Sequence, residues 1–74
     1  MNLIKGNKFD IKSLENIIEQ FERDIERTKR KPKTKKRTKY IKELEQLIEY
    51  RKDKIRILEI EIEIEEIKEA RKNE

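Results

Sequence analysis

Apolar residues recur at alternating steps of three and four along two stretches of this chain, and this spacing constrains the fold more than any other feature. The first series reads Ile11, Leu14, Ile18, Phe21, Ile25 and Thr28. Such a series lines one face of a helix and predicts a seam that packs against another helix. Asp10 is the expected N-cap, because its carboxylate can accept from free N–H groups of the first turn. Since Pro32 cannot extend a helix, we expect a tail over 1–9 and a helix over 10–31.

A second series of the same spacing follows the proline. It reads Ile41, Leu44, Ile48, Arg51, Ile55 and Leu58. When the two series run antiparallel, Ile41 faces Thr28 and Leu58 faces Ile11, and the positions of every facing pair add up to the same value. This register predicts an all-α fold, an antiparallel helical hairpin forming a single domain. We expect the connector over 32–37 and a longer second helix over 38–72.

Arg51 is the one charged member of the second series. Its long stem can lie across Ile18, which it faces in this register, while its charge stays in water. Arg51 is therefore compatible with the predicted hairpin.

Residues 58–67, LEIEIEIEEI, alternate apolar and acidic side chains, as a half-buried strand does. A strand needs pairing partners, and a chain with one Gly and one Pro has few turns to supply them. On a helix, one apolar stripe continues the hairpin seam and another lies nearly opposite. The opposite stripe consists of Ile57, Ile60, Ile64 and Ile67. Because the first helix is expected to start near position 10, nothing in the same chain covers this stripe, and we expect a homodimer that completes a helical bundle.

Charge is divided between the two ends of the predicted hairpin. Nine basic residues and no acidic residue lie between positions 27 and 39, which gives an electropositive tip. The candidate partner-binding residues of this tip are Arg30, Lys31, Lys33, Lys35, Lys36 and Arg37. The second helix becomes acidic from position 59, and its candidate partner-binding residues are Glu59, Glu61, Glu63, Glu65 and Glu66. Glutamates four apart repel one another on a helix, and a cationic partner surface would relieve this repulsion.

The composition argues against an enzyme. The chain has no Cys and no His, so it lacks disulfides, thiolate ligands and the commonest general base. Ser13, the single serine, has no such base to activate it, and the lone Gly6 cannot form a phosphate-binding loop. We expect no catalytic residue, cofactor or metal site. No apolar run reaches the roughly 20 residues of a membrane span, so we expect no membrane association and a cytoplasmic protein.

Three functions are compatible with these features. The basic tip can neutralise the phosphates of a nucleic acid, although only Tyr40, at its margin, offers a ring for base stacking. The acidic segment can present carboxylates to a protein surface that binds DNA, which is the principle of DNA mimicry. The hairpin can also be a structural coiled-coil adaptor.

Chain length, the basic connector RTKRKPKTKKRTK and the C-terminal segment LEIEIEIEEIKEA together resemble the small sliding-clamp inhibitors of staphylococcal Twort-type phages. The resemblance covers the whole chain. It implies a host-takeover protein whose dimer occupies the DNA channel of the bacterial replicative sliding clamp, the beta subunit of DNA polymerase III. Such a dimer blocks loading of the clamp onto DNA and arrests replication in the bacterial host cytoplasm. Under this resemblance, the glutamates of the second helix face the basic channel.

Overall fold

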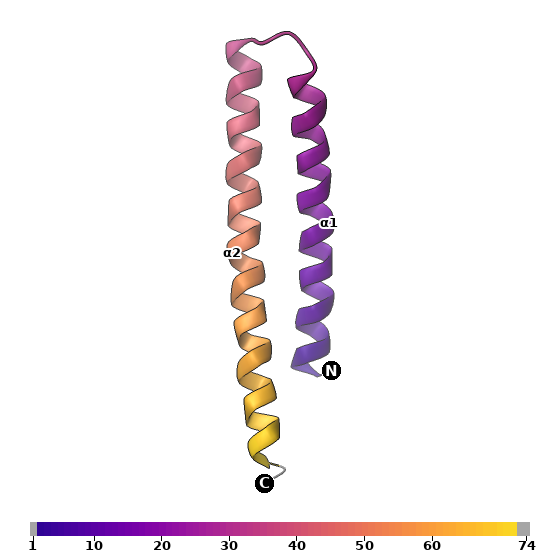
Figure 1. The fold of residues 1–74 in the computed structure, drawn as a ribbon, viewed down its shortest axis with the longest axis vertical. Coiled ribbons are helices and arrows are strands. Elements are labelled where there is room, and N and C mark those ends of the chain that lie inside the picture. The colour runs from indigo at the N-terminus through magenta and orange to yellow at the C-terminus, as the bar shows by residue number, and fades with distance from the viewer. Residues whose placement is uncertain (1, 73–74) are drawn as a thin grey trace.

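Two antiparallel α-helices make up this protein (Figure 1). The computed structural model describes residues 2–72, with α1 over Leu3–Lys29 and α2 over Lys35–Lys72. Residues 30–34 connect them, and the hairpin measures 61 × 15 × 15 Å. The predicted all-α hairpin with a longer second helix is confirmed. The alternating segment at 58–67 is helical throughout.

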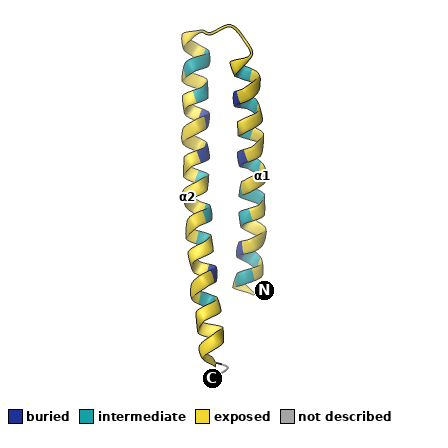
Figure 2. Cartoon of the chain, in the orientation of Figure 1, coloured by how far each residue is buried: buried dark blue, intermediate teal, exposed yellow. Residues whose placement is uncertain are grey.

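The core is one seam between the two helices. Its buried centre consists of Ile18 and Ile25 from α1 with Leu44 and Ile48 from α2. Three half-buried side chains pack against it, and these are Phe21, Ile41 and Ile55. All seven belong to the two apolar series, and in Figure 2 the buried positions lie on the facing sides of the helices. Burial of a Leu or Ile side chain stabilises a fold by roughly 1.5–3 kcal/mol, so these few residues supply most of the apolar stabilisation of the hairpin.

Arg51 lies at the edge of this seam and stacks on an aromatic ring. Its guanidinium carbon is 5.1 Å from the centroid of the Phe21 ring, a cation–π distance. Its Nη1 also donates to the Leu47 carbonyl at 3.3 Å. The guanidinium therefore lies over Phe21. This ring is one helical turn along α1 from Ile18, across which the stem of Arg51 was expected to lie.

The connector is shorter than predicted because Thr34 starts the second helix early. Its Oγ1 accepts from the Arg37 N–H at 3.2 Å, the bond that an N-cap side chain makes to its helix. The Arg37 side chain then reaches back, and Nη1 donates to the Pro32 carbonyl at 2.6 Å. At the other end, Arg30 is the C-cap of α1, and the N–H of Lys31 donates to the Thr28 carbonyl at 3.1 Å. The helix boundaries predicted at 31 and 38 therefore lie at Lys29 and Lys35.

The predicted tail over 1–9 is wrong for residues 3–9, which form the first two turns of α1. Asn2 is the N-cap in place of Asp10, since its Oδ1 accepts from the Ile4 N–H at 2.8 Å. Met1 lies outside the described residues. The additional turns continue the seam, and they leave Ile62 of α2 only 8% exposed.

The longer α1 also changes the surroundings of the acidic segment. Only the last turns of α2 extend past the N-terminal end of α1 (Figure 1). The glutamates at 59–66 therefore lie beside the first turns of α1. Within residues 2–72, neither helix has a stretch long and apolar enough to cross a membrane.

Candidate partner-binding surfaces

Four isoleucines form an exposed row on α2, here called the isoleucine stripe. They are Ile57, Ile60, Ile64 and Ile67, and their exposed fractions lie between 48% and 57%. The prediction that the same chain leaves this stripe uncovered is confirmed. Contiguous exposed apolar patches on small proteins mark interaction sites. A row of four isoleucines over about 15 Å of helix is such a patch.

Tyr50 extends the stripe by one heptad, a contribution that the sequence analysis missed. It precedes Ile57 by seven positions and is 66% exposed. Tyr50 and Ile57 border the same shallow hollow on α2, together with Leu58 and Glu61. The seven-residue spacing of positions 50, 57 and 64 was the sequence signal that Tyr50 belongs to this stripe.

The glutamates of 59–66, here called the acidic rod, border the isoleucine stripe on both sides. At 100° per residue, Glu59, Glu63 and Glu66 fall on one flank of the stripe. Glu61 and Glu65 fall on the other flank. Four of the five are exposed, and Glu65 is half-buried. Glu61 and Glu63 therefore lie nearest the isoleucine stripe, whereas Glu59, Glu65 and Glu66 lie further round α2, toward the seam.

Asn7 connects the acidic rod to α1, a contact that was not predicted from the sequence. Its side chain is buried in the seam, where the constant-sum register places it opposite Ile62. Its Nδ2 donates to the Leu58 carbonyl at 3.2 Å and to Glu61 Oε2 at 3.1 Å. Glu61 is thus held by an intramolecular hydrogen bond, which makes it less free for a partner than Glu59 or Glu63.

The basic tip comprises residues 27–39, and its side chains are largely free of partners within the chain. Arg30, Lys31, Lys33, Lys35 and Lys36 are exposed, and Arg37 is half-buried against the connector. Arg27, also in the tip, pairs with Asp24 at 2.9 Å. The other ion pair found within residues 2–72 joins Arg56 to Asp53 at 3.7 Å, far from the tip.

The first turn of α2 is basic, which opposes the helix dipole. It contains Lys35, Lys36 and Arg37 and no acidic residue. A cation at the positive end of a helix is unfavourable by roughly 0.3–1 kcal/mol at low salt. This arrangement weakens the hairpin locally and attracts an anion.

The basic tip and the acidic rod lie toward opposite ends of the hairpin (Figure 1). Of the 21 basic residues nine lie in the tip, so the remaining 12 face 17 acidic residues and the rest of the chain has a net charge of −5. The overall charge of +4 therefore combines a basic tip of +9 with a net charge of −5 that is spread over the rest of both helices.

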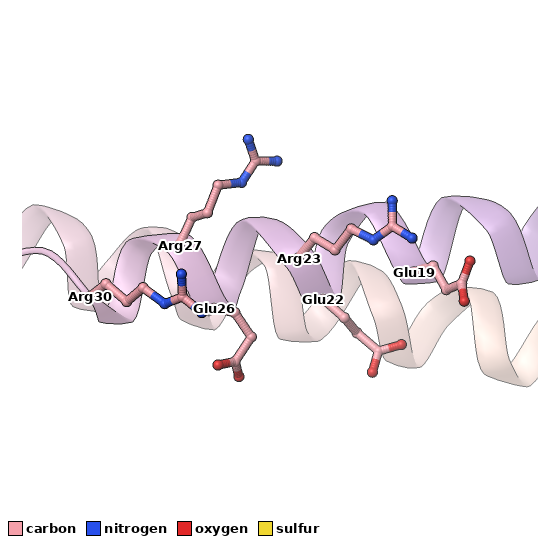
Figure 3. A pocket seen from close by; sticks show the side chains of 6 residues that line it. All are labelled: Glu19, Glu22, Arg23, Glu26, Arg27 and Arg30. Atoms are coloured by element: carbon pink, nitrogen blue, oxygen red, sulfur yellow. The ribbon is translucent and has the colours of Figure 1, made fainter.

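The outer face of α1 has a third charged surface, shown in Figure 3. Its lining residues are Glu19, Glu22, Arg23, Glu26, Arg27 and Arg30. Five of them come from α1 and Arg30 directly follows its end, and the six side chains do not point to one common centre in the figure. Because opposite charges alternate there without converging on one point, we assign no binding site to this face. Within residues 2–72, no group of three or more acidic side chains is placed to hold a metal ion.

Models of protein families, curated proteins and solved structures were compared with the chain, and none of them matches it. The protein is thus a helical hairpin with three candidate partner-binding surfaces, which are the isoleucine stripe, the acidic rod and the basic tip.

Proposed function

We propose that this protein is an inhibitor of the bacterial replicative sliding clamp. A dimer of hairpins enters the DNA channel of the ring and prevents its loading onto DNA, as a phage host-takeover factor in the host cytoplasm. The resemblance to the Twort-type phage inhibitors supplies the identity of the partner. The observation that carries the proposal is the isoleucine stripe with glutamates on both of its flanks.

The thin core of the hairpin supports the dimer. Five apolar residues are buried in the described chain, and none of its side chains falls below 2% exposure. A chain of this length rarely gains enough stability from one such core, and a second copy is a common remedy. Packing two isoleucine stripes against each other would bury eight isoleucines in a self-complementary interface.

The charge density of the acidic rod supports the DNA channel as its target. Five glutamates lie within 59–66, a helical length of about 11 Å, which gives roughly one negative charge per 2 Å. Duplex DNA carries one negative charge per roughly 1.7 Å of its axis. The acidic rod therefore presents carboxylates at a density close to that of the phosphates that a sliding clamp surrounds.

The position of the basic tip is compatible with this arrangement. Lys36 and Glu59 are separated by 23 positions on α2, or about 35 Å of helix. The Debye length is about 10 Å at 0.1 M salt. Repulsion between the tip and the basic channel wall is therefore screened when only the acidic end lies in the channel.

A clamp-loading assay tests the proposal. The clamp, its loader and ATP are incubated with primed circular DNA and increasing amounts of the protein, and clamp on the DNA is counted. The proposal predicts that loading falls to background. The variant with Glu59, Glu63 and Glu66 all replaced by Lys should lose this effect, because the acidic rod becomes partly cationic while Glu61 keeps its bond to Asn7.

A matched variant controls for net charge. It carries Glu15, Glu19 and Glu22 replaced by Lys, all exposed on α1 and away from the acidic rod. This variant should inhibit loading as the original chain does, and circular dichroism should show equal helicity for all three proteins. Undiminished loading in the presence of the original chain would overturn the proposal. Equal loss of inhibition in both variants would overturn the role of the acidic rod.

A further inference from the structure

We propose that the basic tip is a second binding surface, for the phosphate backbone of duplex DNA, separate from the surface proposed for the clamp. The tip contains nine basic residues and no acidic residue over positions 27–39. Of these nine, Arg27 alone takes part in an ion pair among the described residues. Arg37 donates to the Pro32 carbonyl, and the other seven cations have no ion pair or side-chain hydrogen bond among the described residues, so they are available to a polyanion.

The basic residues of the tip come from three consecutive parts of the chain. The end of α1 contributes Lys29, the connector contributes Lys31 and Lys33, and α2 begins with Lys35 and Lys36. Lys33, Lys35 and Lys39 line one hollow with Thr34 and Thr38. Lysine ammonium groups on flexible stems bind phosphates as point charges and impose little geometry on them.

The first turn of α2 adds backbone donors to this surface. Thr34 Oγ1 accepts from the Arg37 N–H, and Thr34 O accepts from the Thr38 N–H. The N–H groups of Lys35 and Lys36 precede these two, and groups at such positions have no acceptor within their own helix. They lie between lysine side chains and can donate to a phosphate oxygen.

The composition of the tip favours a nucleic acid over an acidic protein. Residues 27–39 contain no aliphatic or aromatic side chain other than the ring of Pro32. Protein interfaces are usually centred on buried apolar or aromatic anchors. Contact with a phosphate backbone requires none, because its free energy comes from charge neutralisation and counterion release.

The same composition favours a duplex over a single strand. Single-strand binding relies on aromatic side chains on which bases stack. The tip has none, and Tyr40, just beyond it, is a single exposed ring. The expected ligand is therefore a duplex bound without sequence preference.

Fluorescence anisotropy of a labelled random-sequence duplex of about 20 base pairs tests this inference on the full chain, between about 50 and 200 mM salt. The key variant carries Lys33, Lys35 and Lys36 replaced by Gln. We expect its affinity to be at least tenfold lower at about 50 mM salt than that of the original chain. The slope of its affinity against salt should become shallower by about 0.9 for each phosphate that the variant no longer neutralises.

A charge-matched variant has Lys12, Lys52 and Lys54 replaced by Gln, all exposed and outside the tip. Its affinity should stay within twofold of that of the original chain. Equal weakening in the two variants, or absence of binding by the original chain, would overturn the inference. A polyglutamate peptide is titrated in parallel, and equal binding with the same variant dependence would assign the tip to an acidic protein instead. No clamp is present in the assay, so its outcome is independent of the clamp-loading result.

Discussion

Asn7 in α1 donates a hydrogen bond to the carbonyl oxygen of Leu58 in α2 at 3.2 Å, across the seam of the hairpin. The same amide group donates to Glu61 Oε2 at 3.1 Å. Asn7 is the one polar residue buried in the described chain, and its exposed fraction is 8%. A buried amide with fixed partners disfavours sliding of one helix along the other, because any shift would leave it unsatisfied. Asn7 thereby fixes the position of the acidic rod relative to α1.

Replacing Asn7 with Ala should therefore destabilise the hairpin. The loss of two hydrogen bonds and of buried atoms predicts a decrease of about 1–3 kcal/mol in the free energy of unfolding. Asn16→Ala, at an exposed position of the same helix, should change it by less than about 0.5 kcal/mol. Urea unfolding at one fixed protein concentration measures both variants. Equal effects of the two changes would show that the Asn7 bonds do not contribute.

A pair of leucines one turn apart tests where the core lies. Leu44 is 5% exposed in the seam, whereas Leu47 is 42% exposed on the side of α2. Leu44→Ala should lower the free energy of unfolding by about 2–5 kcal/mol, because it leaves a cavity in the seam. Leu47→Ala should lower it much less. Thermal unfolding followed by circular dichroism gives both values, and a Leu47→Ala loss as large as that of Leu44→Ala would contradict the observed register.

The double change of Ile60 and Ile64 to Lys should produce monomers. Four lysines would then face one another in the proposed dimer of isoleucine stripes, where buried unpaired charge is strongly unfavourable. Asn16 and Gln20, both exposed on α1 and away from the stripe, can be changed to Lys to add the same charge as a control. Sedimentation equilibrium should give the dimer mass for the control and the monomer mass for the stripe variant. A dimer mass for both variants would remove the stripe from the interface.

The sequence was sufficient to predict the hairpin because the seam has a strict period. Each facing pair from Ile11 with Leu58 to Thr28 with Ile41 follows one register, and the buried residues of the central core lie within these pairs. The helical state of 58–67 was also predictable, because a strand would have lacked a partner. The exposure of the isoleucine stripe followed from the same geometry.

The first two turns of α1 were not predicted, although the sequence contained a signal for them. The tail was predicted because Asp10 is a suitable N-cap, and Gly6 and Asn7 before it are unfavourable inside helices. However, Ile4, Ile11, Ile18 and Ile25 are spaced seven apart, and Asn2 is as suitable an N-cap as Asp10. The unfavourable local propensity of Gly6 and Asn7 is overridden by contact with α2, where Asn7 finds its two acceptors. Such long-range bonds cannot be read from local sequence.

The most direct measurement is multi-angle light scattering on a gel-filtration column, with the protein alone and then with purified bacterial sliding clamp at moderate salt. The account predicts a dimer alone, and in the mixture one species whose mass equals one clamp ring plus two copies of this chain. A protein that elutes separately from the ring, whatever its own mass, would contradict the account.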